Sequence, residues 1–309
     1  MRRIALAVGD PNGIGPELAV KAAARARAAG RDVVLVADRH VIDDCRTRFG
    51  IADDLPVSAV DALPVEAYRP GTLDPRAGAA TVAYVREAVR LCEAGEVAGV
   101  VACPHSETAI NRAGIPFSGY SGLLAELTGT PKERVFLMLV AAGLRIVHAT
   151  LHESTRAALE RLSVDLVVAA GEASAAALRD LGIAQPTLGV FGINPHAGEG
   201  GLFGDEDERI TRPAVAELAA RGIRADGPVG ADLLLSQRRH DAYVAMFHDQ
   251  GHIPIKLLSP LRASALAIGS PVLFTSVAHG CAYDIAGQGV ADPTGIEEAL
   301  ALIAGSGPA

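Results

Sequence analysis

Three histidines follow three different apolar, strand-like segments of this chain, each within a few residues of the end of the segment. His152 follows LRIVHATL, His196 follows TLGVFGIN and His248 follows YVAMF. Because the carboxyl ends of parallel strands share one edge of a sheet, imidazoles in these positions could meet at one divalent cation and leave positions open for substrate oxygens. Unrelated, hydrogen-bonded histidines are the alternative for any one of them, but their common location favours a metal site.

The stretch FHDQGHIPIK (247–256) carries a second histidine four residues after His248. Two histidines at this spacing face the same way only on a helix, and the glycine and proline within the stretch oppose helix formation. We therefore predict a non-helical stretch in which His248 is the ligand, Asp249 is a polar neighbour and His252 points elsewhere. Lys256 is a candidate for holding a substrate anion or for moving a proton.

Two glycine-rich stretches could bring the backbone close to a ligand. NPHAGEGGLFGDED (194–207) surrounds His196 with glycines, which allows a close approach of backbone N–H groups, although a mobile surface loop is the alternative. In HGCAYDIAGQGVADPTG (279–295), Asp284 could accept hydrogen bonds from the ribose hydroxyls of a dinucleotide. A carboxylate there would repel a 2′-phosphate, which favours NAD over NADP.

The surrounding pattern predicts the fold that must position these groups. Apolar runs of strand length alternate with helix-length, alanine-rich segments along the 309 residues, and several of these segments end at glycine. Such alternation predicts an α/β protein with a mainly parallel sheet, and the length favours two lobes over one. Five polar clusters follow predicted strands and should converge on one active site: GDPNGIGPE, CPHSET, HES, NPHAGEGG and HDQGH.

Composition excludes several classes of function. The net charge is −8, tryptophan is absent and aromatic residues make up 4% of the chain, so neither a basic patch nor a base-stacking surface for nucleic acid is expected. The four cysteines show no CxxC spacing, and charged residues interrupt the alanine-rich segments. We therefore expect no disulfide framework, no membrane span and no signal peptide, as in a cytoplasmic protein.

Seven motifs together resemble the 4-hydroxythreonine-4-phosphate dehydrogenase family nearly from end to end: GDPNGIGPE, INRAGIPFSGY, TLHES, INPHAGEGGLFG, GPVGAD, FHDQGHIPIK and HGCAYDIAG. The resemblance implies an isocitrate/isopropylmalate dehydrogenase-like fold with two α/β/α lobes and the active site in the cleft between them. The expected cofactor-side lobe is 1–125 plus 258–309, and the expected metal-binding and dimerisation lobe is 126–257.

The resemblance also implies cofactors and a partner. One divalent metal per subunit (zinc, or magnesium, manganese, cobalt or iron) would be held by His152, His196 and His248 at the interface of a homodimer with shared active sites. NAD would be the second cofactor, bound by residues of both glycine-rich stretches and by Asp249 beside His248. That expected set is Asn194, Gly198, Asp249, His279, Gly280 and Asp284.

Departures from the family pattern bear on the substrate. Members that act on the phosphorylated threonine have histidine and threonine where Tyr120 and Ser121 stand, and arginine at the place of Phe274. They also have asparagine at Ala265 and lysine at Glu107. Losing these polar and cationic groups argues against a phosphate substrate, because phosphate favours charge-assisted donors. Long runs of the sequence are instead similar to the terephthalate dihydrodiol dehydrogenase branch of the family.

That branch implies oxidative decarboxylation of a small anionic substrate, a cis-dihydrodiol dicarboxylate, to protocatechuate. Asp232 or Lys256 would handle the hydroxyl proton, Asp249 would orient a ligand or the cofactor, and Arg112 or Lys256 would pair with a substrate carboxylate. Tyr120 and Ser121 complete the expected substrate site. The alternatives are a dehydrogenase of 4-hydroxythreonine-4-phosphate or a related phosphorylated sugar acid, and a non-catalytic sensor of aromatic acids on the same fold.

Overall fold

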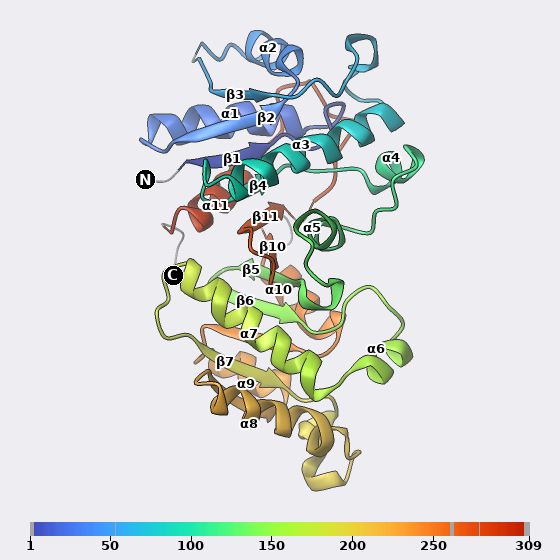
Figure 1. The fold of residues 1–309 in the computed structure, drawn as a ribbon, viewed down its shortest axis with the longest axis vertical. Coiled ribbons are helices and arrows are strands. Elements are labelled where there is room, and N and C mark those ends of the chain that lie inside the picture. The colour runs from blue at the N-terminus through green and yellow to red at the C-terminus, as the bar shows by residue number, and fades with distance from the viewer. Residues whose placement is uncertain (1–2, 53, 260–262, 278, 306–309) are drawn as a thin grey trace. The chain divides into compact units, whose positions relative to one another are not determined.

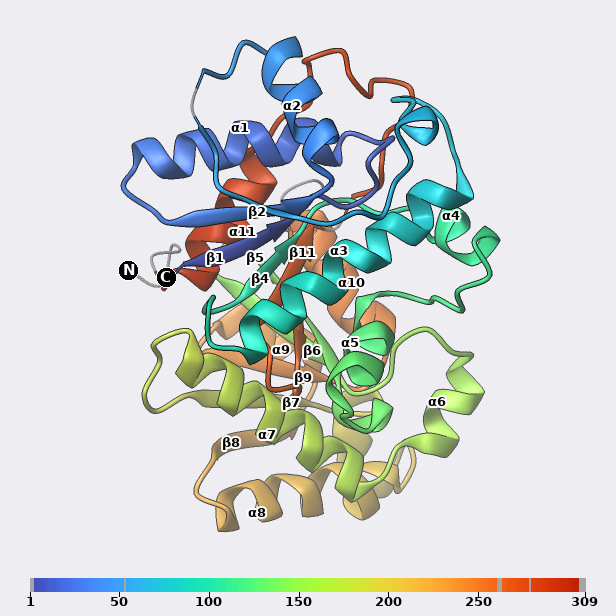
Figure 2. The ribbon, with the colours of Figure 1, turned by 45° about the horizontal axis from the view of Figure 1, so that its top comes forward.

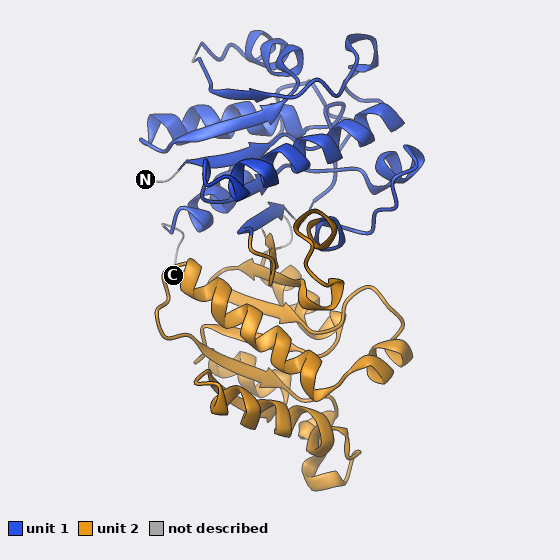
Figure 3. Ribbon diagram, viewed as in Figure 1, with its two compact units in different colours: residues 1–123, 272–309 blue, residues 124–271 orange. Residues whose placement is uncertain are grey.

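The structure, a computed structural model, describes residues 3–52, 54–259, 263–277 and 279–305. The chain divides into two compact units (Figure 3): unit 1 is Met1–Leu123 with Val272–Ala309, and unit 2 is Leu124–Pro271. Each unit has its own strands and its own covering helices (Figure 1). The roles expected for two lobes, cofactor binding in one and metal binding in the other, stay predictions.

Unit 1 contains a parallel arrangement of strands in the order β3-β2-β1-β4-β11. Every residue of β1 and β2 is buried, because these strands are apolar at consecutive positions and therefore fit a sheet that is covered on both faces. The strands are β1 (Ile4–Ala7), β2 (Val33–Ala37), β3 (Val57–Ala59), β4 (Val100–Ala102) and β11 (Phe274–Val277).

The helices of unit 1 cover both faces of these strands. The long helix α3 packs on one face, whereas α1 and α11 pack together on the other (Figure 2). The helical elements are α1 (Gly15–Ala28), α2 (Arg39–Arg48), η1 (Val65–Ala67), α3 (Pro75–Glu93), α4 (Glu107–Arg112) and α11 (Thr294–Ile303). A further helix, α5 (Tyr120–Thr128), begins in unit 1 and ends in unit 2.

Unit 2 contains strands in the order β10-β5-β6-β9-β7-β8. β5 pairs antiparallel with both β10 and β6, and the pairs from β6 onward are parallel. The strands are β5 (Phe136–Ala141), β6 (Leu144–His148), β7 (Thr187–Phe191), β8 (Arg224–Val229), β9 (Ala242–Ala245) and β10 (Ser264–Ile268). The predicted α/β class with a mainly parallel sheet is confirmed.

The helices of unit 2 also lie on both faces, with α7 in front of the strands in Figure 1 and α10 behind them. The helical elements are η2 (Lys132–Arg134), α6 (Thr155–Arg161), α7 (Val164–Asp180), η3 (Pro195–Gly201), η4 (Asp207–Thr211), α8 (Arg212–Ala220), α9 (Ala231–Gln237) and α10 (His248–Leu258). Within the described ranges, no helix combines the length and the apolar character needed to cross a membrane.

Candidate active site

The stretch FHDQGHIPIK begins the helix α10 (His248–Leu258), so the predicted non-helical conformation was wrong. Its N-terminus is capped by the Gln250 side chain, whose Oε1 accepts the backbone N–H groups of Met246 at 2.9 Å and Phe247 at 3.1 Å. Gly251 is required for packing rather than for a turn, because a Cβ there would lie 2.2 Å from Nε2 of His148. Capping and packing together outweigh the low helix propensity of glycine and proline.

Because α10 is a helix, its two histidines share one face. The rings of His248 and His252 are stacked with centroids 3.7 Å apart and planes 12° apart. The prediction that His252 points elsewhere was therefore wrong. The ring of His152, which follows β6, lies 5.7 Å from that of His248. Two of the three predicted metal ligands thus come together at the carboxyl ends of β6 and β9, which are parallel neighbours.

The side chain of Asp249 contacts the ring of His248. Its Oδ1 lies 2.7 Å from Nδ1 of His248, and since a carboxylate can only accept, in the neutral ring Nδ1 carries the hydrogen and Nε2 has the lone pair. A carboxylate behind the non-ligating nitrogen is the usual partner of a metal-bound histidine. This donor set fits a divalent cation at Nε2 of His248.

His196 occupies a left-handed turn after β7. His196, Ala197 and Glu199 have φ values of 53°, 53° and 44°, and Gly198 and Gly200 between and after them also have positive φ. The imidazole is exposed and its ring lies 6.2 Å from that of Phe203. Such a run of left-handed residues is costly for side chains with a Cβ and persists only when its surroundings hold it.

The buried carboxylate of Asp207 holds the start of this turn. Its oxygens accept the backbone N–H groups of Ile193 at 2.8 Å and Asn194 at 2.9 Å, and also the hydroxyl of Thr211 at 2.7 Å. The amide nitrogen of Asn194 donates to Glu206 at 2.8 Å. Asn194, predicted to bind the cofactor, therefore uses its side chain within the turn, and the close approach of Gly198 to Gly204 (2.9 Å from a Cβ to O) keeps the turn compact.

Hydrogen bonds also join the ends of the three parallel strands that carry these histidines. Thr150 Oγ1 donates to the carbonyl of Met246 at 2.6 Å, and Gln250 Nε2 donates to that of Gly192 at 2.9 Å. The ends of β6, β9 and β7 are thereby fixed side by side in unit 2. Among the residues that the structure describes, however, no three His, Cys, Asp or Glu side chains converge as a cation site within the single chain.

The predicted proton-handling residues also lie in unit 2. Lys256 is one turn after His252 on α10, and burial lowers the pKa of its ammonium group. Asp232 is exposed in the first turn of α9. The side chain of Asp249 is 81% exposed, and its carboxylate contacts His248, one of the predicted metal ligands.

In unit 1, Tyr120 lies in a buried aromatic cluster. Its ring centroid is 4.3 Å from that of His105, 5.7 Å from that of Phe117 and 5.0 Å from that of Phe274. Burial raises the pKa of the Tyr120 hydroxyl well above its usual range and lowers that of His105 to about 4. The next residue, Ser121, is half-buried at the start of α5. Arg112 is exposed at the end of α4.

The motif GDPNGIGPE turns its acidic side chains inward and holds the second glycine-rich stretch. The carboxylate of Glu17 is 1% exposed and accepts the backbone N–H groups of Gly289 at 3.1 Å and Ala291 at 2.8 Å. Lys21 pairs with Glu17 at 2.6 Å and donates to the carbonyl of Gly289 at 2.8 Å. Asp10 accepts the hydroxyl of Tyr283 at 2.7 Å. The motif was predicted to contribute to the active site, and its acidic side chains contact the 281–291 segment.

The predicted cofactor residues of that segment are more open. Gly280 and Asp284 are exposed, and a Cβ added at Gly280 would meet no atom within 4 Å. His279 is half-buried, with Nδ1 3.3 Å from the carbonyl of Gly280. The carboxylate of Asp284 is therefore open to solvent, on a segment that hydrogen bonds to Glu17 and Asp10 hold in place.

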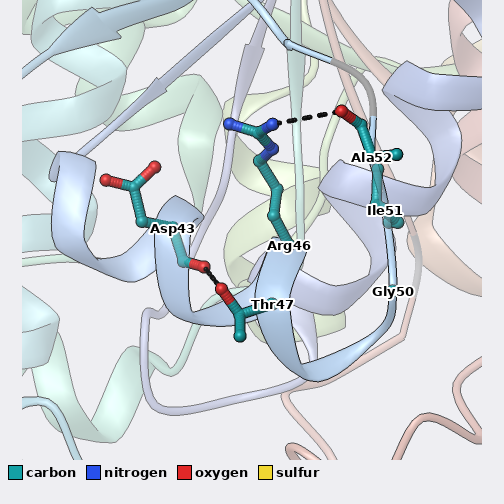
Figure 4. Close-up of a pocket in the computed structure, with 6 residues that line it drawn as sticks. All are labelled: Asp43, Arg46, Thr47, Gly50, Ile51 and Ala52. Atoms are coloured by element: carbon teal, nitrogen blue, oxygen red, sulfur yellow. Dashed lines mark hydrogen bonds between the residues drawn. The ribbon is translucent and has the colours of Figure 1, made fainter.

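A hollow of about 500 Å³ lies at the end of α2 in unit 1 (Figure 4). Arg46 donates to the carbonyl of Ala52 at 3.4 Å, and Thr47 donates to that of Asp43 at 2.9 Å. None of the residues predicted to act in catalysis lines it. Its walls are Asp43, Arg46, Thr47, Gly50, Ile51 and Ala52.

Sequence reasoning missed several residues of these networks. His148 is 2% exposed and hydrogen-bonded to His252, and Asp207 is fully buried. His148 could have been noticed as a histidine inside an apolar strand segment, four residues before His152. For Asp207, an acidic residue among several others in GDED, the sequence gives no sign that it alone is buried.

Comparison with known proteins shows that the chain is related to dehydrogenases. Residues 16–303 match the family described as "Pyridoxal phosphate biosynthetic protein PdxA", and the chain belongs to this family. Its dehydrogenases, which include 4-hydroxythreonine-4-phosphate dehydrogenases, depend in general on NAD and a metal. The suspected family relationship is confirmed.

Among its relatives, the 1,2-dihydroxy-3,5-cyclohexadiene-1,4-dicarboxylate dehydrogenase of Comamonas sp is 53% identical over 307 residues, which are 98% of this chain and 97% of that protein. A terephthalate 1,2-cis-dihydrodiol dehydrogenase of Burkholderia xenovorans LB400 has a similar structure, with a TM-score of 0.79, 48% identity and coverage of 99% and 98%. The 4-hydroxythreonine-4-phosphate dehydrogenase of Klebsiella pneumoniae gives a TM-score of 0.86 at 32% identity, with coverage of 98% and 99%.

Proposed function

We propose that the protein is an NAD- and divalent-metal-dependent dehydrogenase that oxidises and decarboxylates a cis-dihydrodiol dicarboxylate, terephthalate dihydrodiol, to protocatechuate. The observation that carries this substrate choice is the contact between Tyr120 and Phe274, whose rings are 5.0 Å apart. These are the two positions where histidine and arginine stand in the phosphate-using members. Because both side chains are buried, the pair supplies no cation for a phosphate and makes this part of unit 1 apolar, which suits a carbocyclic substrate. The likeness to the Comamonas and Burkholderia enzymes supports the same choice.

The substrate chemistry has two stages. The ring carbon beside the one that bears hydroxyl and carboxylate loses a hydride to NAD and its hydroxyl loses a proton, which gives a β-keto acid. The C–C bond to the carboxylate then breaks, carbon dioxide leaves, and the electron pair forms the third double bond of the ring, which leaves the former carbonyl oxygen as an enolate. Protonation of that oxygen gives the catechol directly, so aromatisation drives the second stage.

Within this proposal, His152, His196 and His248 hold the cation, with Asp249 fixing the tautomer of His248 through the 2.7 Å contact. When bound, the cation supplies Lewis-acid chemistry at the oxygen that is oxidised. Asp284 receives the ribose hydroxyls of NAD, because its carboxylate is exposed and the segment around it is fixed by Glu17. Gly280 allows close approach of the backbone to the dinucleotide.

Lys256 is the best placed of the residues proposed to move the hydroxyl proton. It lies on the same helix as His248, and burial lowers its pKa, which makes the neutral amine easier to reach near neutral pH. Asp232 is the other candidate for that role. Arg112, exposed on α4, is proposed to pair with a substrate carboxylate, with Ser121 as a further polar contact.

We also propose that the enzyme is a homodimer with shared active sites. Apolar side chains remain exposed on the helix that carries His248: Ile253 is 55% exposed and Leu257 is 79% exposed. Leu202 and Phe203, beside His196, are 72% and 47% exposed. A second copy that covers these side chains would also complete the metal site, because the three predicted histidine ligands do not meet within the described residues of one chain. All four cysteines are free thiols, in keeping with a cytoplasmic location.

The test is a substrate panel with metal-loaded protein and NAD, followed by NADH absorbance and by detection of protocatechuate. Turnover of the dihydrodiol with release of carbon dioxide is expected. Turnover of 4-hydroxythreonine-4-phosphate or a phosphorylated sugar acid alone would overturn the substrate choice. If no candidate is oxidised and one of them raises the melting temperature, the protein is a sensor of that compound.

A further inference from the structure

Behind His248 lies a chain of hydrogen bonds that reaches into the core of unit 2. His148, at the end of β6, is 2% exposed. Its Nδ1 lies 3.1 Å from the carbonyl oxygen of Leu137 on β5, and its Nε2 lies 3.0 Å from Nδ1 of His252.

The carbonyl at the inner end fixes the tautomer of both rings. A carbonyl oxygen only accepts, so Nδ1 of His148 must carry the hydrogen, and Nε2 of neutral His148 is then an acceptor. Nδ1 of His252 must therefore be a donor to His148. The same N–H faces the backbone carbonyl of His248 at 3.3 Å, which is also an acceptor. All the hydrogen bonds of His148 and His252 described above are therefore consistent with one placement of the ring hydrogens.

This arrangement holds the ring of His252 in one orientation, and that ring in turn covers one face of His248. The two rings are 12° from parallel at 3.7 Å. Asp249 holds the edge of His248 at Nδ1. The imidazole of His248 is thus fixed by a stacked neighbour on its face and by a carboxylate on its edge.

The stacked geometry also separates the roles of the two rings. A metal ion lies close to the plane of each imidazole that binds it, and two stacked, nearly parallel rings with centroids 3.7 Å apart cannot both hold one ion in their planes. Within this arrangement only one ring of the pair can ligate. Asp249 behind His248 identifies that ring as the ligand, which leaves His252 as its support.

We propose that His252, anchored by His148, is a positioning residue that holds the imidazole of His248 in the orientation for metal binding. The inference rests on the proposed function in that it takes His248 as a ligand. A rotamer locked before the ion arrives lowers the entropic cost of binding, so loss of His252 weakens metal affinity rather than removing a ligand.

The experiment measures metal binding directly, with wild-type protein and with His252→Ala, His252→Phe and His148→Leu. Zn²⁺ affinity is measured by calorimetric titration, and the geometry of the site is followed by the visible spectrum of the Co²⁺-loaded protein. Circular dichroism and thermal unfolding report on the fold. His240→Gln is the matched control, because His240 is a histidine of unit 2 whose Nε2 pairs with Asp226 at 2.8 Å.

His252→Ala is expected to weaken Zn²⁺ affinity about 10- to 100-fold and to change the Co²⁺ spectrum at unchanged metal stoichiometry. His252→Phe keeps a stacked ring without the anchor and is expected to fall between Ala and wild type, as is His148→Leu. The control should retain wild-type affinity. If His252→Ala does not fold, His252→Phe decides the question through the same two measurements.

Folded variants of His252 with wild-type Zn²⁺ affinity and an unchanged Co²⁺ spectrum would overturn the positioning role. A wild-type protein that binds no metal would instead overturn the proposed function. The two failures are therefore distinguishable. A stoichiometry that drops in His252→Ala would also contradict the inference, because it would make His252 a ligand.

Discussion

Tyr120 at the start of α5 and Phe274 at the start of β11 pack against each other with ring centroids 5.0 Å apart. Phe274 is fully buried and Tyr120 is 6% exposed, so the pair forms part of the core of unit 1. Two positions that the sequence marks as departures from the phosphate-using pattern are thus neighbours in space. A change at one alters the surroundings of the other.

The pair leads to the first prediction. Phe274→Arg should destabilise the protein by about 3–5 kcal/mol, because it buries a guanidinium without an anionic partner among aromatic rings. The double variant Phe274→Arg with Tyr120→His should not recover oxidation of the dihydrodiol. If this double variant folds, we expect it to gain activity on a phosphorylated substrate. Denaturant unfolding and the substrate panel measure both effects. Tyr120→Phe, which keeps the ring and loses only a 3.4 Å bond to the Cys103 carbonyl, should stay within about 1 kcal/mol of wild type.

Glu17 gives the second prediction. Glu17→Gln removes a buried charge that accepts two backbone N–H groups and pairs with Lys21, so unfolding free energy should fall by about 2–3 kcal/mol. Because the 289–291 backbone would shift, KM for NAD should rise about tenfold with a smaller change in kcat. The comparison variant is Glu297→Gln, whose partner Arg25 is 62% exposed and whose loss should cost less than about 1 kcal/mol. Equal effects of the two variants would show that Glu17 does not act on the loop.

The third prediction concerns cofactor choice. Asp284→Lys should weaken binding of NAD more than that of NADP, because the exposed carboxylate is lost and the new ammonium group attracts a 2′-phosphate. The measured quantity is the ratio of kcat/KM for the two cofactors, which should move by about tenfold or more. Asp292→Lys on the same segment, whose carboxylate caps Thr294 at 2.6 Å, is the charge-matched control. An unchanged ratio in Asp284→Lys would refute the ribose assignment.

His196 provides the fourth prediction. His196→Ala should lose bound metal and turnover while the protein remains folded, as measured by elemental analysis, NADH formation and circular dichroism. His196→Gly should lose metal equally but be about 1 kcal/mol more stable than the alanine variant, because φ at this position is 53°. Wild-type metal content in either variant would count against the site.

The fifth prediction is a pH dependence of stability. Burial lowers the pKa of His105 to about 4 from the usual 6.5, so folding favours the neutral ring. A group with a depressed pKa contributes stability above its unfolded value that is lost as the pH falls toward the folded value. Between pH 7.5 and pH 5, His105 should therefore account for a loss of about 1–2 kcal/mol. His105→Phe should flatten this part of the stability profile, and an unchanged slope in that variant would assign the loss to other groups.

Much of the fold could be read from the sequence because its strands are apolar at consecutive positions. β1, β4, β6, β7 and β9 precede the five polar clusters, as predicted. β3, with two half-buried residues and one exposed, and β8, which contains glycine and proline, lack this pattern. The helix α10 was missed for another reason: its glycine and proline lower its intrinsic propensity, and its stability comes from a contact with His148 that local sequence does not reveal.

The candidate site was predictable to a similar extent. The approach of His152 to His248 follows from the adjacency of parallel strands, which a strand-end argument anticipates. The left-handed turn at His196 and the burial of Asp207 depend on tertiary hydrogen bonds, so they could not be predicted from spacing.

The absence of a side chain at residue 251 couples two positions that lie far apart along the chain. A methyl group there would overlap Nε2 of His148, so alanine is tolerated at 251 only in company with a smaller residue at 148. The pair should therefore behave as a single unit in mutagenesis: His148→Ala with Gly251→Ala is expected to be less damaging than the sum of its parts. Any redesign of the histidine cluster has to treat these two sites together.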